Sequence, residues 1–376
     1  MSDSLEKIKS SLQHKISTQI KQKGAISFAE FMRMALYEPG LGYYSAGLHK
    51  FGKAGDFVTS SELGDLFAQC HASCFAEILP TISSPVIFEL GAGSGQFCVD
   101  VLLALDELNC LPDAYWIFEV SGALKQTQQE AVKQLPAALA DRVKWLHAPP
   151  DEVFNGIIYA NEVLDALPVE VFRFKHDQYQ RLMLTDEAGQ LTETWDDFPA
   201  DLSAQLTQKE LQLAAGYRSE FIPNLSAWFA SVVKNLQQGA VLMVDYGYGR
   251  PTYYHPQRHT GTLVCHRRHQ ANFNPYQDVG LQDITAFVDF TAVAEAMESV
   301  GLTVCGFTNQ ADFLLNNGID KHLDADGEYQ TYFQQVTEMK QLVMPEEMGE
   351  KFKVIAAHRN LPLNLSGFSV NYWQTL

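Results

Sequence analysis

Three glycines stand at alternate positions after a short apolar run. Gly91, Gly93 and Gly95 follow residues 86–90, in which Glu89 is the only charged residue. An apolar run of this length indicates a buried strand. Glycines directly after a strand let the backbone turn tightly and bring its N–H groups against a ligand. Residues 96–108 are predicted to form a helix, so this ligand would lie at a helix N-terminus, as nucleotide-type cofactors do.

The spacing of these glycines indicates which class of cofactor the loop binds. The dinucleotide fingerprint has glycine at its first, third and sixth positions. Counted from Gly91, the sixth position is Gln96, which disfavours an NAD-dependent oxidoreductase. The pattern Glu-x-Gly-x-Gly-x-Gly from Glu89 instead resembles the first motif of class I S-adenosylmethionine (SAM) methyltransferases. An ordinary strand–helix turn is the alternative, but three alternate glycines cost more backbone entropy than such a turn requires.

An acidic residue at the end of the next predicted strand supports a cofactor with a ribose. Glu119 follows Gly95 by 24 residues and lies between Phe118 and Val120. In a mononucleotide-binding half, an acidic residue here accepts hydrogen bonds from the ribose hydroxyls. The alternative is a solvated carboxylate at the end of a strand.

A polar segment follows the fourth predicted strand and contains Asn161, Glu162 and Asp165. The carboxyl ends of neighbouring parallel strands form the ligand crevice, so these three residues would face the transferred group and are the candidate catalytic residues. A guanidinium is charged near neutral pH, and carboxylates bind it through paired hydrogen bonds. If the segment is helical, Glu162 and Asp165 share one face. The alternative is that Asn161 or Asp165 only caps a helix. Asp245, after the fifth strand, is either a further substrate carboxylate or part of a turn.

Strand and helix patterns alternate from residue 86 onward. Helices are predicted at 96–108, 121–134 and 290–300, and strands at 86–90, 115–120, 143–147, 156–160, 240–245, 302–307 and 352–358. Alternation of this kind predicts an α/β fold with a mostly parallel sheet and helices on both of its faces.

Two further regions flank and interrupt this core. Residues 1–85 are predicted as a helical extension, with helices at 4–23, at 28–37 and from Ser60 or Ser61 to Leu79. Residues 169–238 are predicted as an inserted α+β module. Its antiparallel strands are expected at 169–174, 179–185 and 191–195, with Ala188 and Gly189 in a turn. The core is then 86–168 together with 239–376, in which residues 246–286 read as irregular.

The bulk composition narrows the classes of protein. The chain has 376 residues, a hydrophobic content of 46% and a formal net charge of −18. Such a charge argues against a nucleic-acid binder, which needs clustered Lys and Arg. The six cysteines form no Cys-x-x-Cys pair, so we expect no metal. We also expect no membrane insertion, because no apolar run approaches the length of a membrane-spanning helix.

Six separated blocks, in one order along the chain, resemble the MidA-like methyltransferases, which are bacterial and mitochondrial proteins. The blocks are Glu38–Tyr44, Gly55–Ser60, Glu89–Gly95, Asn161-Glu162 with Asp165–Pro168, Gln282–Thr285 with Val288–Phe290, and Met348–Glu350 with Phe352-Lys353. The resemblance implies a class I SAM methyltransferase core of Rossmann-like type with a family-specific cover.

The resemblance also implies roles for individual residues. Glu89, the three glycines and Glu119 would bind SAM, and the loop 55–60, with Asp56, Thr59 and Ser60, would lie over it. Mitochondrial members methylate an arginine of a respiratory complex I subunit, which makes a protein substrate the expectation here. Because the N-terminus carries acidic residues and no arginine before Arg33, we expect a bacterial, cytoplasmic protein without a transit peptide.

A binding function is the alternative to enzymatic activity. An assembly chaperone could keep the methyltransferase fold and dock a partner through residues 169–238 and 246–286. A homodimer is possible under either reading. The identity of the methyl acceptor does not transfer with the fold, because the sequence does not say whether the host has complex I.

Overall fold

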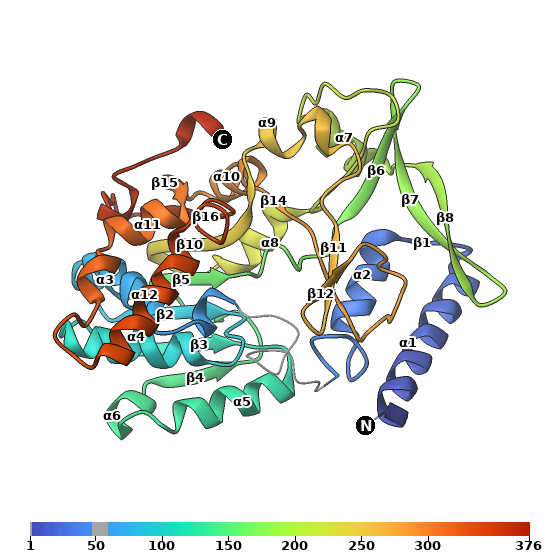
Figure 1. Cartoon of the computed structure of the whole chain (residues 1–376). Coiled ribbons are helices and arrows are strands. Elements are labelled where there is room, and N and C mark those ends of the chain that lie inside the picture. The colour runs from blue at the N-terminus through green and yellow to red at the C-terminus, as the bar shows by residue number, and fades with distance from the viewer. Residues whose placement is uncertain (1, 47–58) are drawn as a thin grey trace.

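The computed structural model describes residues 2–46 and 59–376, and an eight-stranded sheet forms its centre (Figure 1). The strands are β2 (Pro85–Leu90), β3 (Ala114–Phe118), β4 (Val143–Leu146), β5 (Phe154–Asn161), β10 (Leu236–Tyr248), β14 (Val288–Asp289), β15 (Thr303–Asn309) and β16 (Phe352–Arg359). Their order is β15-β16-β10-β5-β2-β3-β4, with β14 paired to β10. The five strands from β4 to β10 are parallel, whereas β16 and β15 are antiparallel to their neighbours. The predicted fold class is confirmed.

Helices cover both faces of this sheet because its strands alternate their side chains between two cores. On β2, Ile87 belongs to one core and Phe88 to the other. The helices of the first core include α3 (Leu66–Ile78), α4 (Gln96–Glu107), the short α6 (Ala137–Ala140), α11 (Gln310–Asn316) and α12 (Tyr329–Val343). Those of the second are α8 (Leu225–Val232) and α10 (Phe290–Ser299). The helix α5 (Gly122–Val132) packs beside α4.

The N-terminal helices and the insertion share a third core. The inserted strands are β6 (Glu170–Lys175), β7 (Gln178–Glu187), β8 (Gln190–Asp197) and β9 (Arg218–Phe221). The helix α7 (Ala200–Thr207) lies between β8 and β9, and α8 follows β9. The first three form the predicted antiparallel set, with Ala188 and Gly189 in the turn at positive φ. The short β1 (Ile26–Ser27) pairs with β7, and α1 (Ser2–Lys23) and α2 (Phe28–Tyr37) pack against this sheet. The domain division of the chain stays a prediction.

Two local predictions are wrong. Residues 246–286 are not irregular: they contain α9 (Arg250–Tyr253) and a three-stranded sheet of β11 (Val264–Arg267), β12 (Gln270–Asn272) and β13 (Asp283–Thr285). These strands are too short and polar to show alternation, and their hairpin turn uses Arg268 and His269 rather than glycine. The helix expected from Ser60 or Ser61 begins only at Leu66. Its first N–H donates to the Glu338 carboxylate at 2.9 Å, a partner from far along the chain.

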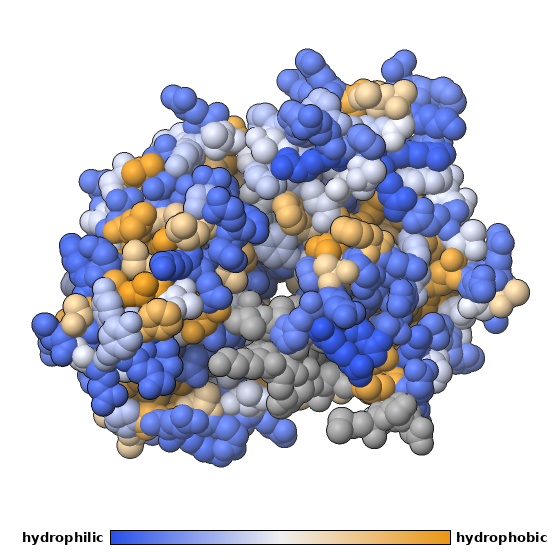
Figure 2. Space-filling view, in the orientation of Figure 1, coloured by the Kyte–Doolittle hydropathy of each residue, from blue (hydrophilic) through white to orange (hydrophobic). Residues whose placement is uncertain are grey.

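Hydrophilic side chains dominate the face of the molecule in Figure 2, in keeping with the net charge of −18. Among the helices of residues 2–46 and 59–376, none is long and apolar enough to cross a bilayer.

Two glycines allow the central strands to approach closely. Gly156 on β5 and Gly239 on β10 are register partners and have φ of +153° and +151°. A Cβ added at Gly239 would lie 1.8 Å from the Gly156 carbonyl oxygen, and one at Gly156 would lie 1.8 Å from the Val86 oxygen. No side chain can relieve either overlap, because both atoms are backbone.

We therefore expect Gly239→Ala to lower the free energy of unfolding by at least about 2 kcal/mol, from backbone strain and displacement of a neighbouring strand. Urea unfolding measures this. Gly122→Ala is the control, since nothing lies within 4 Å of its Cβ position. Equal stability of the two variants would contradict the prediction.

Candidate functional site

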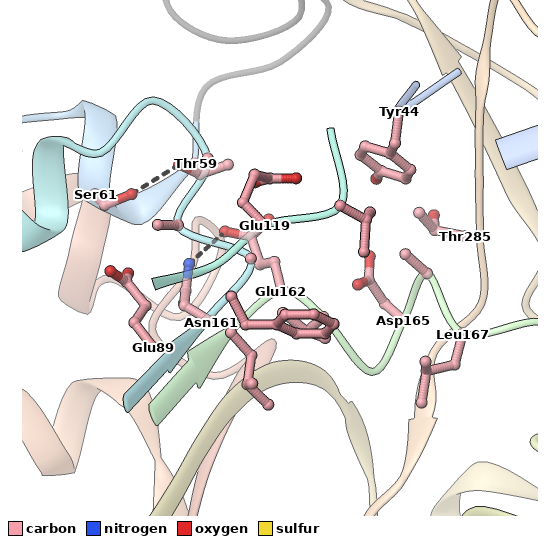
Figure 3. A pocket seen from close by; sticks show the side chains of 18 of the residues that line it. Tyr44, Thr59, Ser61, Glu89, Glu119, Asn161, Glu162, Asp165, Leu167 and Thr285 are labelled. Carbon is pink, nitrogen blue, oxygen red and sulfur yellow. Dashed lines mark hydrogen bonds between the residues drawn. The ribbon is translucent and has the colours of Figure 1, made fainter. Parts of the chain in front are cut away.

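A cavity of about 750 Å³ opens at the carboxyl ends of β2, β3, β5 and β10. This is the crevice predicted for a parallel sheet of this kind. Its wall also includes Tyr37 from α2, Tyr44 from the segment that follows, and Asp283 from β13. Figure 3 shows Glu89, Thr59 and Ser61 toward one side of the cavity and Tyr44, Asp165 and Thr285 toward the other.

The glycine loop forms part of this wall. Gly91, Gly93 and Gly95 have φ of +66°, +53° and +87°, conformations that side chains disfavour. Gly91 and Gly93 line the cavity, whereas Gly95 does not and is the N-cap residue of α4. A Cβ at Gly95 would lie 3.0 Å from Cα of Gln128. Gly95 therefore lets α4 pack against α5 and acts on the cavity through the shape of the loop.

Glu119 lies at the cavity wall with a side chain that is held in place. Its Oε1 accepts a hydrogen bond from the Ser121 N–H at 2.7 Å, and its Oε2 accepts one from Gln128 Nε2 at 2.9 Å. Gln128 also donates to the Gly93 carbonyl at 3.0 Å and accepts from Trp145 Nε1 at 3.0 Å. One buried amide thus fixes the glycine loop and the predicted ribose carboxylate relative to each other.

Sequence reasoning missed Gln128. The signal that could have found it is a polar residue on an otherwise apolar stripe of a predicted helix, between Leu124 and Val132. Such a residue needs buried hydrogen-bond partners.

Of the other predicted cofactor residues, some line the cavity and others do not. Glu89 lines the cavity, and its Oε2 accepts from the Tyr115 hydroxyl at 2.9 Å. Burial raises the pKa of Glu89 to about 8. Thr59 lines the cavity and shares a hydrogen bond of 3.1 Å with Ser61. Ser60 is fully buried and lies off the wall, with its hydroxyl 3.4 Å from Gln310 Oε1. Asp56 lies outside the described residues.

The segment with the candidate catalytic residues is a series of turns, so the helical spacing considered for Glu162 and Asp165 is wrong. Glu162 has φ of +53°, which stores strain, and its N–H donates to the Val244 carbonyl at 2.9 Å. The Leu164 and Asp165 N–H groups donate to Asp245 Oδ2 at 2.9 and 3.2 Å. Asp245 is fully buried and absent from the cavity wall, so it holds this loop and does not face a substrate.

Asn161, Glu162 and Asp165 all line the cavity, and Asn161 Nδ2 donates to Glu162 Oε1 at 3.2 Å (Figure 3). Burial, and then the charge of Asp165, raises the pKa of Glu162 to about 8. Burial raises the pKa of Asp165 to about 6, against a hydrogen bond from Tyr246 that lowers it. Acids held this far from water favour a positively charged ligand.

Two acceptor atoms at this end of the cavity are buried and without a hydrogen-bond partner among residues 2–46 and 59–376. They are Oδ1 of Asn161 and Oδ1 of Asp165. Buried acceptors are normally satisfied, so these atoms indicate a donor that arrives with a ligand. A guanidinium has five N–H donors and no acceptor, which matches this need.

Comparison with known proteins agrees with this geometry. Residues 68–308, more than half of the chain, match a family described as "Putative S-adenosyl-L-methionine-dependent methyltransferase". The chain is 28% identical over 381 residues to protein arginine methyltransferase NDUFAF7, mitochondrial, of Danio rerio, covering 92% of this chain and 86% of that protein. The human protein of that name is 27% identical over 376 residues, covering 90% of this chain and 81% of its own length.

A solved structure has a higher sequence identity to this chain than these two relatives. A Burkholderia thailandensis protein, described as a "likely methyl transferase" bound to S-adenosyl-homocysteine, superposes with a TM-score of 0.94 at 37% identity. The match covers 100% of this chain and 99% of that one. The resemblance to MidA-like methyltransferases is thereby confirmed. The chain belongs to this family of S-adenosyl-L-methionine-dependent methyltransferases.

Proposed function

We propose that this enzyme transfers the methyl group of SAM to an arginine of a protein substrate. The observation that carries the proposal is the end of the cavity at Glu162 and Asp165, where buried carboxylates and unsatisfied acceptor atoms favour a donor-rich cation. The names of the mitochondrial relatives point to the same acceptor.

The residues at the other end of the cavity, which we call the cofactor end, fit SAM. Gly91 and Gly93 line the cavity at positive φ, and a Cβ at Gly91 would lie 3.0 Å from Val163 Cγ2. The Glu119 carboxylate, oriented by Gln128, suits a pair of ribose hydroxyls. SAM supplies a methyl group activated on a positively charged sulfonium. The S-adenosyl-homocysteine in the Burkholderia relative supports this assignment.

We call the end of the cavity at Glu162 and Asp165 the acceptor end. There the chain aligns the arginine with the methyl group and holds its positive charge in place. An arginine is a poor nucleophile because its lone pairs are delocalised over a charged plane with a pKa near 13.8. Glu162 and Asp165 would accept its N–H groups and hold the positive charge away from the attacking nitrogen. Holding the nitrogen in line with the methyl supplies much of the catalytic effect.

The decisive experiment uses an extract of a deletion strain, purified protein and methyl-labelled SAM. We expect label in protein, and mass spectrometry should find it on arginine. Label on another residue type, or none in protein at all, would overturn the proposed acceptor.

Gly93→Val should weaken SAM binding by at least about 100-fold, because a β-branched side chain at positive φ distorts the loop that lines the cavity. Isothermal titration calorimetry measures the affinity. Gly189→Val is the matched control, since Gly189 also has positive φ (+87°) but lies in the β7–β8 turn away from the cavity. Unchanged affinity of Gly93→Val in a folded sample would remove the glycine loop from the cofactor site.

Glu162→Gln should keep SAM affinity within about 3-fold of the parent and lower turnover by at least about 100-fold, because it removes the charge that faces the acceptor. Calorimetry gives the first quantity and label incorporation the second. Equal losses of SAM affinity and of turnover would instead assign Glu162 to the residues that bind the cofactor.

Methyl transfer should rise with pH at low acceptor concentration. Only the ionised form of Glu162 can stabilise a guanidinium, and burial raises its pKa to about 8, so the active fraction grows as pH increases toward that value. The measurement is the rate of label transfer between about pH 6.5 and 9, a range that spans the pKa. The rise should be absent in Glu162→Gln. A parent rate that is flat over this range contradicts the assignment.

A further inference from the structure

Two aspartates at the acceptor end of the cavity are each bound by a tyrosine hydroxyl. Tyr246 donates to Asp165 Oδ2 at 2.5 Å, and Tyr44 lies 3.1 Å from both oxygens of Asp283. All four residues line the cavity. They come from distant parts of the chain: Tyr44 follows α2, Asp165 lies in the turns after β5, Tyr246 is on β10 and Asp283 begins β13.

The Asp165–Tyr246 pair leaves one carboxylate oxygen for a ligand. Asp165 is 5% exposed, and within the described ranges its Oδ1 has no hydrogen-bond partner. The Asp165 carbonyl also accepts from the Ala286 N–H at 3.0 Å, so the backbone of this loop is tied to the segment after β13. Tyr246 thus fixes one oxygen, and the other is left to accept a hydrogen bond from a ligand.

The Asp283–Tyr44 pair is equally enclosed. Asp283 is 2% exposed, and its Oδ1 accepts from the Ile284 N–H at 3.0 Å. The Tyr44 ring stacks on Tyr37 with centroids 5.5 Å apart, and the Tyr37 hydroxyl donates to the Ala166 carbonyl at 2.9 Å. Tyr37 therefore connects the two pairs, since Ala166 is next to Asp165.

The pairs act on one another and on Glu162 through their charges. The negative charges of Asp283 and Asp165 contribute to raising the pKa of both Tyr37 and Tyr44, after burial, so these tyrosines stay neutral donors. The same two charges contribute to the raised pKa of Glu162. A cation bound between the aspartates would relieve this repulsion, and the neighbouring tyrosine rings would add a cation–π attraction.

We propose that Asp283 is a second acceptor-binding carboxylate at the same end of the cavity as Asp165, and that Tyr44 and Tyr246 are positioning residues that orient the two carboxylates toward a guanidinium. The proposal deepens the proposed function and rests on it. A planar group with five donors can reach carboxylates on two different elements at once, whereas an ammonium is a compact charge with three donors. Two carboxylates on separate elements would thus favour arginine over lysine as acceptor.

The test measures methyl incorporation from labelled SAM into protein of a deletion-strain extract, over a dilution series of that extract. Asp283→Asn and Tyr44→Phe should each lower incorporation by at least about 10-fold in dilute extract and recover partly as the extract is concentrated. SAM affinity should stay within about 3-fold of the parent, because neither residue touches the cofactor end. A role in folding alone would not produce this dependence on acceptor concentration.

Tyr253→Phe is the matched control. Its hydroxyl lies 3.2 Å from a carboxylate oxygen of Glu220 in another fully enclosed tyrosine–carboxylate pair, and Tyr253 is not on the cavity wall. The Tyr253→Phe variant should show the same dependence of methyl incorporation on extract concentration as the parent. If Asp283→Asn does not fold, Tyr44→Phe decides, since it removes only a hydroxyl.

The outcomes separate the two hypotheses. If the parent labels no protein arginine, the proposed function fails. If the parent labels arginine while Asp283→Asn and Tyr44→Phe perform like Tyr253→Phe at every dilution, the proposed function stands and this inference is overturned.

Discussion

The site depends on one buried carboxylate that is not part of its wall. Asp245, on the strand β10, is fully enclosed and accepts hydrogen bonds from the N–H groups of Leu164, Asp165 and Tyr246. Burial, and then the charges of Asp165 and Glu162, raises its pKa well above the usual range. Hydrogen bonds from the three backbone N–H groups offset the free-energy cost of burying this carboxyl group. The same bonds hold the turns after β5 in place. Together with the hydrogen bond from the Glu162 N–H to the Val244 carbonyl, they tie the turns that carry the candidate catalytic side chains to β10.

The turns after β5 also bring acidic side chains together in a buried place, which is unfavourable for the stability of the fold. Glu162, Asp165 and Asp283 share one end of a cavity, and each carboxylate makes ionisation of the others harder. Natural sequences accept such local conflicts at functional sites, where a ligand resolves them. A cationic acceptor is the ligand that would resolve this one.

The acceptor end also explains why the chain is larger than its central sheet requires. Its wall combines the core sheet with α2 and with the three-stranded sheet of β11–β13. The N-terminal helices are in turn packed on the inserted sheet, where β1 extends β7. The added elements therefore shape the end of the cavity near Glu162 and Asp165, while the glycine loop and Glu119 belong to the core.

The sequence by itself determined the cofactor end, because its signals are local. Alternate glycines after an apolar run, and an acidic residue after the next strand, are consequences of backbone geometry over a few residues. The core strands β2, β3, β4, β5, β10, β15 and β16 and the helices α4, α5 and α10 followed from the same kind of local periodicity. Tertiary structure alone decided the acceptor end. The hydrogen bond between Tyr44 and Asp283 joins residues 239 positions apart, and that between Asp165 and Tyr246 joins residues 81 apart. Glu162 and Asp165 face one cavity through a turn held by Asp245, where a helical spacing was the natural expectation. No periodicity within one segment encodes such contacts, because they form only when separate elements pack together.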